Sequence, residues 1–375
     1  MHIEQLDPAD RRAVGQFIRL PFHLYRSDPR WVPPLLPGER ERFKPDFAYY
    51  QHSEAAFFTV YSAGQMVGRI AVLVHCPHNA YRGTRDALLY LYECIDDDEA
   101  ARQLFEAAAG WASGRGLNRL VGPKGFFTAE GIGLQVEGFT EKVSFGIPYN
   151  PPYYQRHWEA IGGMQTANEY VSAIAYREGF EMPERILRLA KKIRKRRGFH
   201  VPHFTDRRQI LDYVDDIKQA YNEAFAPLWA YTPVPDVEVE AIVRRMLFVL
   251  GDPNLVTIVL KGDDMVGFQF IYPDIAPIVR FMRGRLNPLT ALLIVLHRRF
   301  ARRLLANGNA ILPAYQGLGA NAVLYEAMLH TLAEGQAQEV ELVQIETANA
   351  AMLSDMEHII GSRIVKRHRV YQRDL

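Results

Sequence analysis

Cysteine is nearly absent from this chain of 375 residues, which contains only Cys76 and Cys94. Two cysteines outside any metal-ligand spacing form no disulfide framework, and they favour a reduced, cytoplasmic setting. The chain also has almost no net charge, with a formal value of +1 at pH 7. This near-neutrality argues against nucleic acid as a partner. The histidines are scattered without metal-ligand spacing, so we expect no metal.

Long apolar runs are missing as well. The longest, Leu289–Leu296, is less than half of the roughly 20 residues that a membrane-spanning helix needs. Residues 1–7 are too polar for a signal peptide. An apolar content of 48% is ordinary for packed cores, and the length suits two domains.

Strands and helices alternate in the same predicted order through both halves. The expected strands are 55–61, 65–75, 87–95, 118–121 and 169–176, then 199–203, 255–260, 265–272, 306–312, 340–345 and 363–371. The expected helices are 10–20, 99–113, 150–162 and 184–197, then 206–225, 236–250, 289–305, 322–333 and 349–361, with 273–288 irregular. This order predicts an α/β fold of two divergent copies, residues 1–197 and 198–375.

A Gly-rich turn joins the predicted strand 306–312 to the helix 322–333. Gly317 and Gly319 permit a sharp turn with no Cβ in the way. The first amides of a helix have no intrahelical partner, and with the helix dipole they form a site for an anion such as phosphate. An ordinary strand-to-helix turn is the alternative.

The loop resembles the pyrophosphate loop of the GNAT acyltransferase superfamily, Gln/Arg-x-x-Gly-x-Gly/Ala. Gln316 and Gly319 match its first two positions, whereas Asn321 departs from the third. The resemblance implies a mixed, mostly antiparallel sheet flanked by helices in each domain, and acyl-CoA as co-substrate. The residues that it implies for acyl-CoA binding are Ile311, Leu312, Gln316, Gly317, Leu318, Gly319, Ala320, Asn321 and Asn349.

A closer resemblance covers nearly the whole chain. Residues 28–35, 67–71, 122–125 and 148–154 are similar to a bacterial group of tandem GNAT-like proteins that includes bacterial ceramide synthases. The implied acceptor is a long-chain amine such as a sphingoid base. Acetylation of a small soluble amine, and a non-catalytic degenerate GNAT module, are the alternatives that stay open.

Acyl transfer from a thioester needs a neutral amine, a donor to the thioester oxygen and an acid for the leaving thiolate. The predicted strand 306–312 holds no acidic residue, and Met356 stands where many family members place a tyrosine acid. We therefore take Glu346 and Tyr371 as the catalytic candidates, with Tyr325 and His368 beside them. Capping for Glu346 and Asn349, and a core position for Tyr371, are the structural alternatives.

Three further segments carry charge or apolar surface. The helix at 184–197 is basic and amphipathic, which predicts either contact with an anionic membrane or packing of its apolar stripe on a neighbour. The apolar start of the helix at 289–305 is expected to line an acyl-chain groove or to pack on the sheet. The acidic turn 95–99 suits a helix cap and would repel a pyrophosphate, so the first half should not bind CoA in the usual mode.

Overall fold

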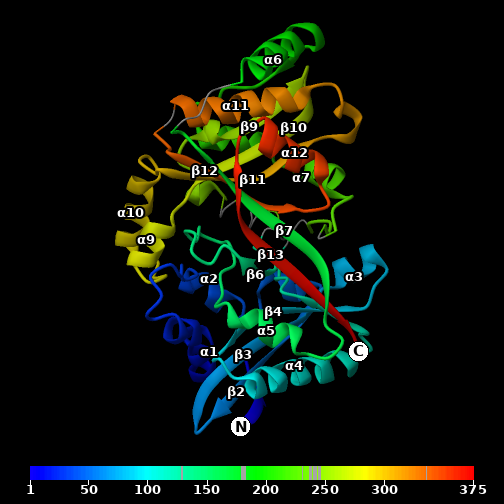
Figure 1. The fold of residues 1–375 in the computed structure, drawn as a ribbon, viewed down its shortest axis with the longest axis vertical. Helices are drawn as coiled ribbons and strands as arrows, with labels where there is room; N and C mark the ends of the chain where they lie inside the picture. The colour runs from blue at the N-terminus through cyan, green and yellow to red at the C-terminus, as the bar shows by residue number, and fades with distance from the viewer. Residues whose placement is uncertain are drawn as a thin grey trace. The chain divides into compact units, whose positions relative to one another are not determined.

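The structure is a computed structural model that describes residues 1–127, 130–178, 183–229, 231–235, 239, 243, 246–334 and 336–375. The chain divides into two compact units (Figure 1). The first comprises Met1–Tyr170, Ala276–Thr290 and Lys366–Leu375, and the second comprises Val171–Ile275 and Ala291–Val365. The predicted domain boundary between 197 and 198 stays a prediction, and residues 184–197 belong to the second unit.

The strands of the first unit follow the order β1-β2-β3-β4-β5-β13, and β6 also pairs with β13. They are β1 (His2–Gln5), β2 (Glu54–Ser62), β3 (Gln65–Val74), β4 (Asp86–Cys94), β5 (Arg119–Gly122), β6 (Leu134–Glu137) and the end of β13 (Arg363–Asp374). The helices are α1 (Arg11–Leu24), α2 (Leu36–Glu41), η1 (Ala48–Gln51), α3 (Cys76–Arg82), α4 (Asp98–Ser113), α5 (Tyr153–Glu159) and α9 (Ala276–Phe281).

Local signals set much of this unit. Ala63 and Gly64, both with positive φ, close the β2–β3 hairpin as such turns require. Asp10 accepts hydrogen bonds from the N–H groups of two residues in the first turn of α1, which is why the helix begins there. The core lies between α4 and the sheet, with Phe105 and Trp158 fully buried.

The strands of the second unit follow the order β12-β11-β10-β9-β8. They are β8 (Phe199–His200), β9 (Val256–Lys261), β10 (Asp264–Pro273), β11 (Arg303–Ile311) and β12 (Glu339–Glu346), and β7 (Gln165–Tyr176) contributes residues to both units. The helices are α6 (Glu184–Arg197), η2 (Arg207–Tyr213), α7 (Val214–Phe225), η3 (Pro253–Leu255), η4 (Pro313–Tyr315), α11 (Ala320–Glu334) and α12 (Ala350–His358). Helix α10 (Pro288–His297) begins in the first unit and continues in the second from Ala291.

Apolar residues cover both faces of the part of the sheet that belongs to the second unit. On one face, Ile258 and Phe268 pack in the same cluster as residues of α7. On the other, Val259 and Val266 pack with Val323 of α11. In each unit, an antiparallel hairpin leads to a parallel pair of strands that is connected by a helix. The predicted α/β class, with mixed and mostly antiparallel sheets, is confirmed.

One predicted helix is wrong in part. The helix expected at 289–305 ends at His297, and Leu304 and Leu305 instead belong to β11, where they pair with β10. A short apolar run fits a helix or a buried strand equally well, and here strand pairing decided. The irregular segment 273–288 contains α9, and the helix predicted at 236–250 falls mostly outside the described residues.

Candidate acyl-CoA site

The predicted cofactor loop lies between β11 and α11. Gly317 has a φ of 71° and Gly319 a φ of 86°, a left-handed conformation that side-chain-bearing residues adopt at a cost. The Nε2 atom of Gln316 donates a hydrogen bond of 3.1 Å to the carbonyl oxygen of Ile311. Gln316, the first residue of the motif, therefore connects the turn to the end of β11.

The start of α11 has three backbone amides that have no partner among the described residues. Within the described part of the chain, the N–H groups of Gly319, Ala320 and Asn321 donate no hydrogen bond. They stand at the positive end of a helix of 15 residues. Such a terminus favours a bound anion, and a Cβ at position 317 would meet open space. The backbone therefore fits a phosphate group.

The strands β11 and β12 part near the loop. Their parallel pairing runs from Arg303 and Glu339 to Ala306 and Leu342, whereas β11 stays paired with β10 as far as Ile311. Gln344 has a φ of 50°, which bends β12. Beyond Ala306, β11 thus lacks pairing with β12 in this register. An extended ligand can form hydrogen bonds with the backbone groups along such a strand edge, as an added strand would.

A polar stretch in β11, which we did not predict, lies beside this edge. The Asn309 Nδ2 donates to the Oε1 of Gln269 at 3.1 Å, and the Asn307 Nδ2 donates to the hydroxyl of Tyr272 at 3.4 Å. Gly308 has a φ of 91°, and the β10–β11 register shifts here. Burial raises the pKa of Tyr272 to about 12. The signal was Asn-Gly-Asn inside an otherwise apolar strand.

Glu346 is the last residue of β12 and is half-buried. Its Oε2 accepts a hydrogen bond from the N–H of Trp229 at 3.1 Å, so the carboxylate holds the segment that follows α7. Asn349 caps α12, because its Oδ1 accepts from the N–H of Met352 at 3.1 Å. The cap that we weighed for Asn349 is present. The catalytic role of Glu346 and the cofactor contact of Asn349 stay predictions.

Tyr325 and Met356 are turned into the core. The Tyr325 hydroxyl donates to the Oδ2 of Asp355 at 2.7 Å, and burial together with Asp355 raises its pKa well above the usual range. Met356 is buried in the same cluster. Tyr325 therefore joins α11 to α12 and is a poor candidate for the acid.

Tyr371 and His368 belong to the first unit, whereas the other predicted site residues belong to the second. The Tyr371 hydroxyl donates to the Oε1 of Glu159 at 3.0 Å, and its ring packs on Trp158. Burial raises the pKa of this phenol, which keeps it protonated. The Nε2 of His368 lies 3.0 Å from the carbonyl oxygen of Pro148. The role of Tyr371 as acid stays a prediction.

Helix α6, the predicted membrane helix, packs along α11 (Figure 1). Ile186 and Ala190 are buried on that contact, and Arg194 pairs with Glu326 at 2.5 Å. A Cβ on Gly319 would lie 2.8 Å from the Ile193 Cδ1. The packing alternative thus describes α6, and membrane contact through its apolar stripe is unsupported because α11 covers that stripe.

The acidic turn of the first unit acts as a helix cap. The Asp97 side chain accepts from the N–H of Ala100 at 2.9 Å, and both Asp96 and Asp98 pair with Arg156. The carboxylates therefore occupy the place that corresponds to the second unit's phosphate loop. Among the described residues, no group of three metal-ligating side chains comes together, and none of the described helices is long and apolar enough to cross a bilayer.

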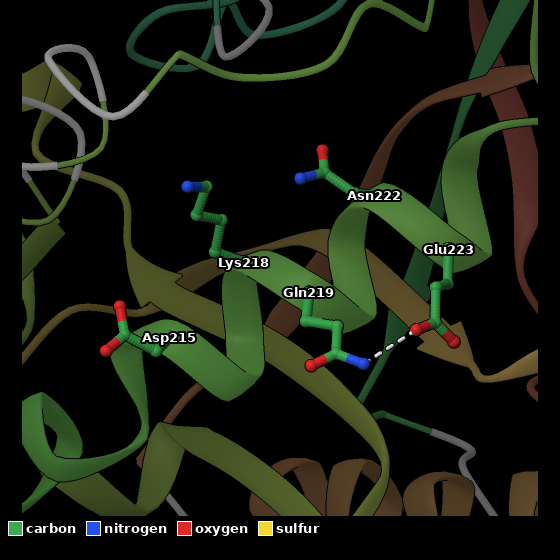
Figure 2. Close-up of a pocket in the computed structure, with 5 residues that line it drawn as sticks. All are labelled: Asp215, Lys218, Gln219, Asn222 and Glu223. Atoms are coloured by element: carbon green, nitrogen blue, oxygen red, sulfur yellow. Dashed lines mark hydrogen bonds between the residues drawn. The ribbon is translucent and has the colours of Figure 1, made fainter.

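A shallow pocket lies over α7, as Figure 2 shows. Its lining residues are Asp215, Lys218, Gln219, Asn222 and Glu223, which follow one another at helical spacing along one face. Gln219 donates to Glu223 at 2.8 Å. The pocket is an open polar surface of one helix, and it shares no residue with the loop. The candidate cofactor site at the loop is therefore supported by the backbone geometry of the loop and not by this pocket.

No family model matches the chain. Over 98% of its length it is 24% identical to protein YghO of Escherichia coli, covering 94% of that protein. Over 73% of its length it is 25% identical to the bacterial ceramide synthase of Caulobacter vibrioides, covering 71% of it.

Solved structures share the fold. A tandem GNAT protein from the clavulanic acid pathway matches all of this chain and 98% of its own, with a TM-score of 0.54 and 13% identity. A GCN5-related N-acetyltransferase from Sphaerobacter thermophilus matches all of this chain and 95% of its own, with a TM-score of 0.51 and 14% identity. The chain therefore has the fold of a tandem GNAT acyltransferase, and it is similar in sequence to a bacterial ceramide synthase.

Proposed function

We propose that the chain is an acyl-CoA-dependent N-acyltransferase whose acceptor is a long-chain amine of the sphingoid type. The observation that carries the proposal is the loop of Gly317 and Gly319, which leaves three amides at the start of α11 without partners in the described part of the chain. The second support is the separation of β11 from β12 beside it. The acceptor class rests on the relative that is named a ceramide synthase.

In this proposal the loop binds the phosphates of CoA. The N–H groups of Gly319, Ala320 and Asn321 donate to the pyrophosphate, and the Gln316–Leu318 turn holds them in place. The pantetheine arm then lies along the open edge of β11, where Ile311 and Leu312 supply backbone hydrogen bonds. Asn349, at the start of α12, contacts the cofactor from the end of β12.

The last turn of α6 supplies positive charge near this loop. Ile193 lies against Gly319, and the four residues that follow it are Arg194, Lys195, Arg196 and Arg197. Arg194 is paired with Glu326, and the other three are exposed. Cations beside a helix terminus strengthen its attraction for phosphate. In this proposal the basic last turn of α6 therefore helps to bind the phosphates of CoA.

The proposed reaction forms an amide bond and breaks the thioester bond. Glu346 accepts the proton of the acceptor ammonium, directly or through a water, so that the neutral amine attacks the thioester carbonyl carbon. Backbone amides of β11 donate to the carbonyl oxygen as it gains negative charge. The leaving thiolate takes up the proton that the nitrogen loses as the amide bond forms.

Thermal unfolding with CoA, acetyl-CoA and palmitoyl-CoA tests the cofactor assignment, because a ligand that binds the folded state raises the melting temperature. The variant is Gly317→Glu, which places a carboxylate at the loop in open space. Gly262→Glu is its matched control, since that glycine also has a left-handed φ, of 63°, and open space around it.

We expect wild type and Gly262→Glu to respond to CoA and Gly317→Glu to lose the response. An added shift with palmitoyl-CoA below its micellar concentration, followed by detection of an N-acylated sphingoid base by mass spectrometry, supports the lipid acceptor. Equal shifts for CoA, acetyl-CoA and palmitoyl-CoA, with acetylation of a soluble amine, favour a small-amine acetyltransferase. No shift with any of them rejects the proposal in favour of a degenerate fold.

A further inference from the structure

Helix α10 turns most of its apolar side chains outward. Leu289, Leu292 and Leu296 are 55%, 54% and 51% exposed, at a spacing that places them on one face. The opposite face holds the helix in place, because Thr290 and Ile294 are fully buried. Neither alternative that the sequence offered, an acyl-chain groove or packing on the sheet, describes this outward face.

The apolar surface extends past the end of the helix. Val295 is 36% exposed on the same side, and Phe300, three residues after α10 ends, is 64% exposed. We name Leu289, Leu292, Val295, Leu296 and Phe300 the α10 face. Large apolar side chains gathered in this way, rather than scattered singly, mark a contact with a partner or a membrane.

The stretch of sequence that contains the α10 face carries charge of one sign. Residues 275–325 contain no aspartate or glutamate, while arginines stand at 280, 283, 285, 298, 299, 302 and 303. Arg299 and Arg302 are exposed, and within the described residues neither side chain forms an ion pair. Arg303 is different, since it points inward and lies 3.0 Å from Glu341.

A further arginine comes from another element. Burial lowers the pKa of Arg298, and the nearby positive charges of Arg207, in η2, and of Arg299 lower it further. These guanidinium groups repel one another in the free protein. An anionic surface over them relieves that repulsion, which is the charge complementarity expected of a basic rim.

We infer that the α10 face docks on an anionic membrane surface, with its apolar side chains in the headgroup region and the flanking arginines on lipid phosphates. The helix has 10 residues, about 15 Å, so it lies in the interface rather than spanning the bilayer. A second copy of the chain fits less well, because a twofold contact through this face brings arginines against arginines. The inference does not depend on the proposed reaction.

Vesicle flotation tests this inference on the full chain. The vesicles are phosphatidylcholine alone and phosphatidylcholine with about one-third phosphatidylglycerol. One variant carries Leu292→Glu with Leu296→Glu, and its control carries Tyr176→Glu with Ile364→Glu, which are 42% and 50% exposed elsewhere. A second variant carries Arg299→Glu with Arg302→Glu, and its control carries Lys191→Glu with Lys192→Glu on the exposed side of α6.

Wild type is expected to float with the anionic vesicles far more than with the neutral ones. The leucine variant should bind at least about tenfold more weakly, and the arginine variant about fivefold more weakly for each charge removed. Both controls should float like wild type, and all variants should keep the wild-type circular dichroism spectrum.

Several results would overturn the inference. These are no flotation of wild type, unchanged flotation of the leucine variant, or equal loss in the controls. A dimer in analytical ultracentrifugation that the leucine variant dissociates, without vesicle binding, would assign the α10 face to self-association instead.

Discussion

Lys124 is a lysine buried in the first unit, and its replacement by methionine tests how its charge affects stability. The side chain is 8% exposed, and its Nζ lies 3.2 Å from the Nδ1 of His78. Burial lowers the pKa of Lys124 from 10.5 to about 7, with Arg82 adding to the effect. Methionine has a similar length and carries no charge, so it removes the charge and keeps most of the packing.

The size of the effect follows from that shift in pKa. The difference between 10.5 and about 7 corresponds to about 5 kcal/mol, at about 1.4 kcal/mol per unit. Between these two pH values the unfolded chain binds a proton that the folded protein does not, so the free energy of unfolding rises with pH. Below pH 7 the lysine is protonated in both states, and its burial costs the full amount.

The assay is urea denaturation of wild type and Lys124→Met from pH 7 to 10.5. At pH 7 the variant is expected to be more stable by about 3–5 kcal/mol, less whatever the contact with His78 contributes. This advantage should shrink by about 1.4 kcal/mol per pH unit and nearly vanish at pH 10.5. Exposed Lys44→Met separates the burial effect from general effects of pH on the fold.

A difference between variant and wild type that stays constant over this range would refute the reasoning. It would mean that the Lys124 ammonium remains charged in the folded protein and is stabilised by its neighbours. A loss of stability at every pH would likewise assign the lysine to a structural ion pair.

Three more predictions concern the two units. Arg303→Met should cost about 3–5 kcal/mol in urea denaturation, because it leaves the fully buried Glu341 without the partner that lies 3.0 Å away. Glu346→Gln should lower kcat by about 10²-fold or more while the thermal shift with CoA is kept, and wild-type turnover would remove Glu346 from the catalytic set. Asp86, whose pKa is lowered to about 2 by its hydrogen bonds to His78 and Arg119 despite burial, should contribute about 1–2 kcal/mol above pH 4, so the deficit of Asp86→Asn should shrink as the pH falls from about 4 to 2 in acid titrations.

The order of elements was readable from local signals. Asp10 and Asn349 cap the helices that they precede, and Ala63-Gly64 forms the turn between the predicted strands 55–61 and 65–75. Gly317 and Gly319 adopt the left-handed backbone that suggested a phosphate loop. Each of these signals works over a few residues, because capping and turn geometry depend on the nearest backbone groups. The resemblance to the GNAT family added the roles of the loop residues.

Only the tertiary structure decided where the ambiguous apolar segments go. Leu304 and Leu305 join β11 because β10 and β12 offer partners for their backbone groups. The stripe of α6 lies on α11, although its sequence suits a membrane equally well. The face of α10 is left exposed, although its sequence suits a core. An amphipathic pattern indicates that one face of a helix needs a partner, but it does not identify that partner.

The polar features of the two units were also beyond sequence reasoning. The separation of β11 from β12 depends on a register between residues more than thirty positions apart. The burial of Lys124 beside His78 joins β5's end to α3 across a similar distance. Short-range signals in the chain thus determined its elements and its glycine loop. The partners of each face, and the charges that became buried, were decided by long-range packing, because they depend on contacts that no local pattern encodes.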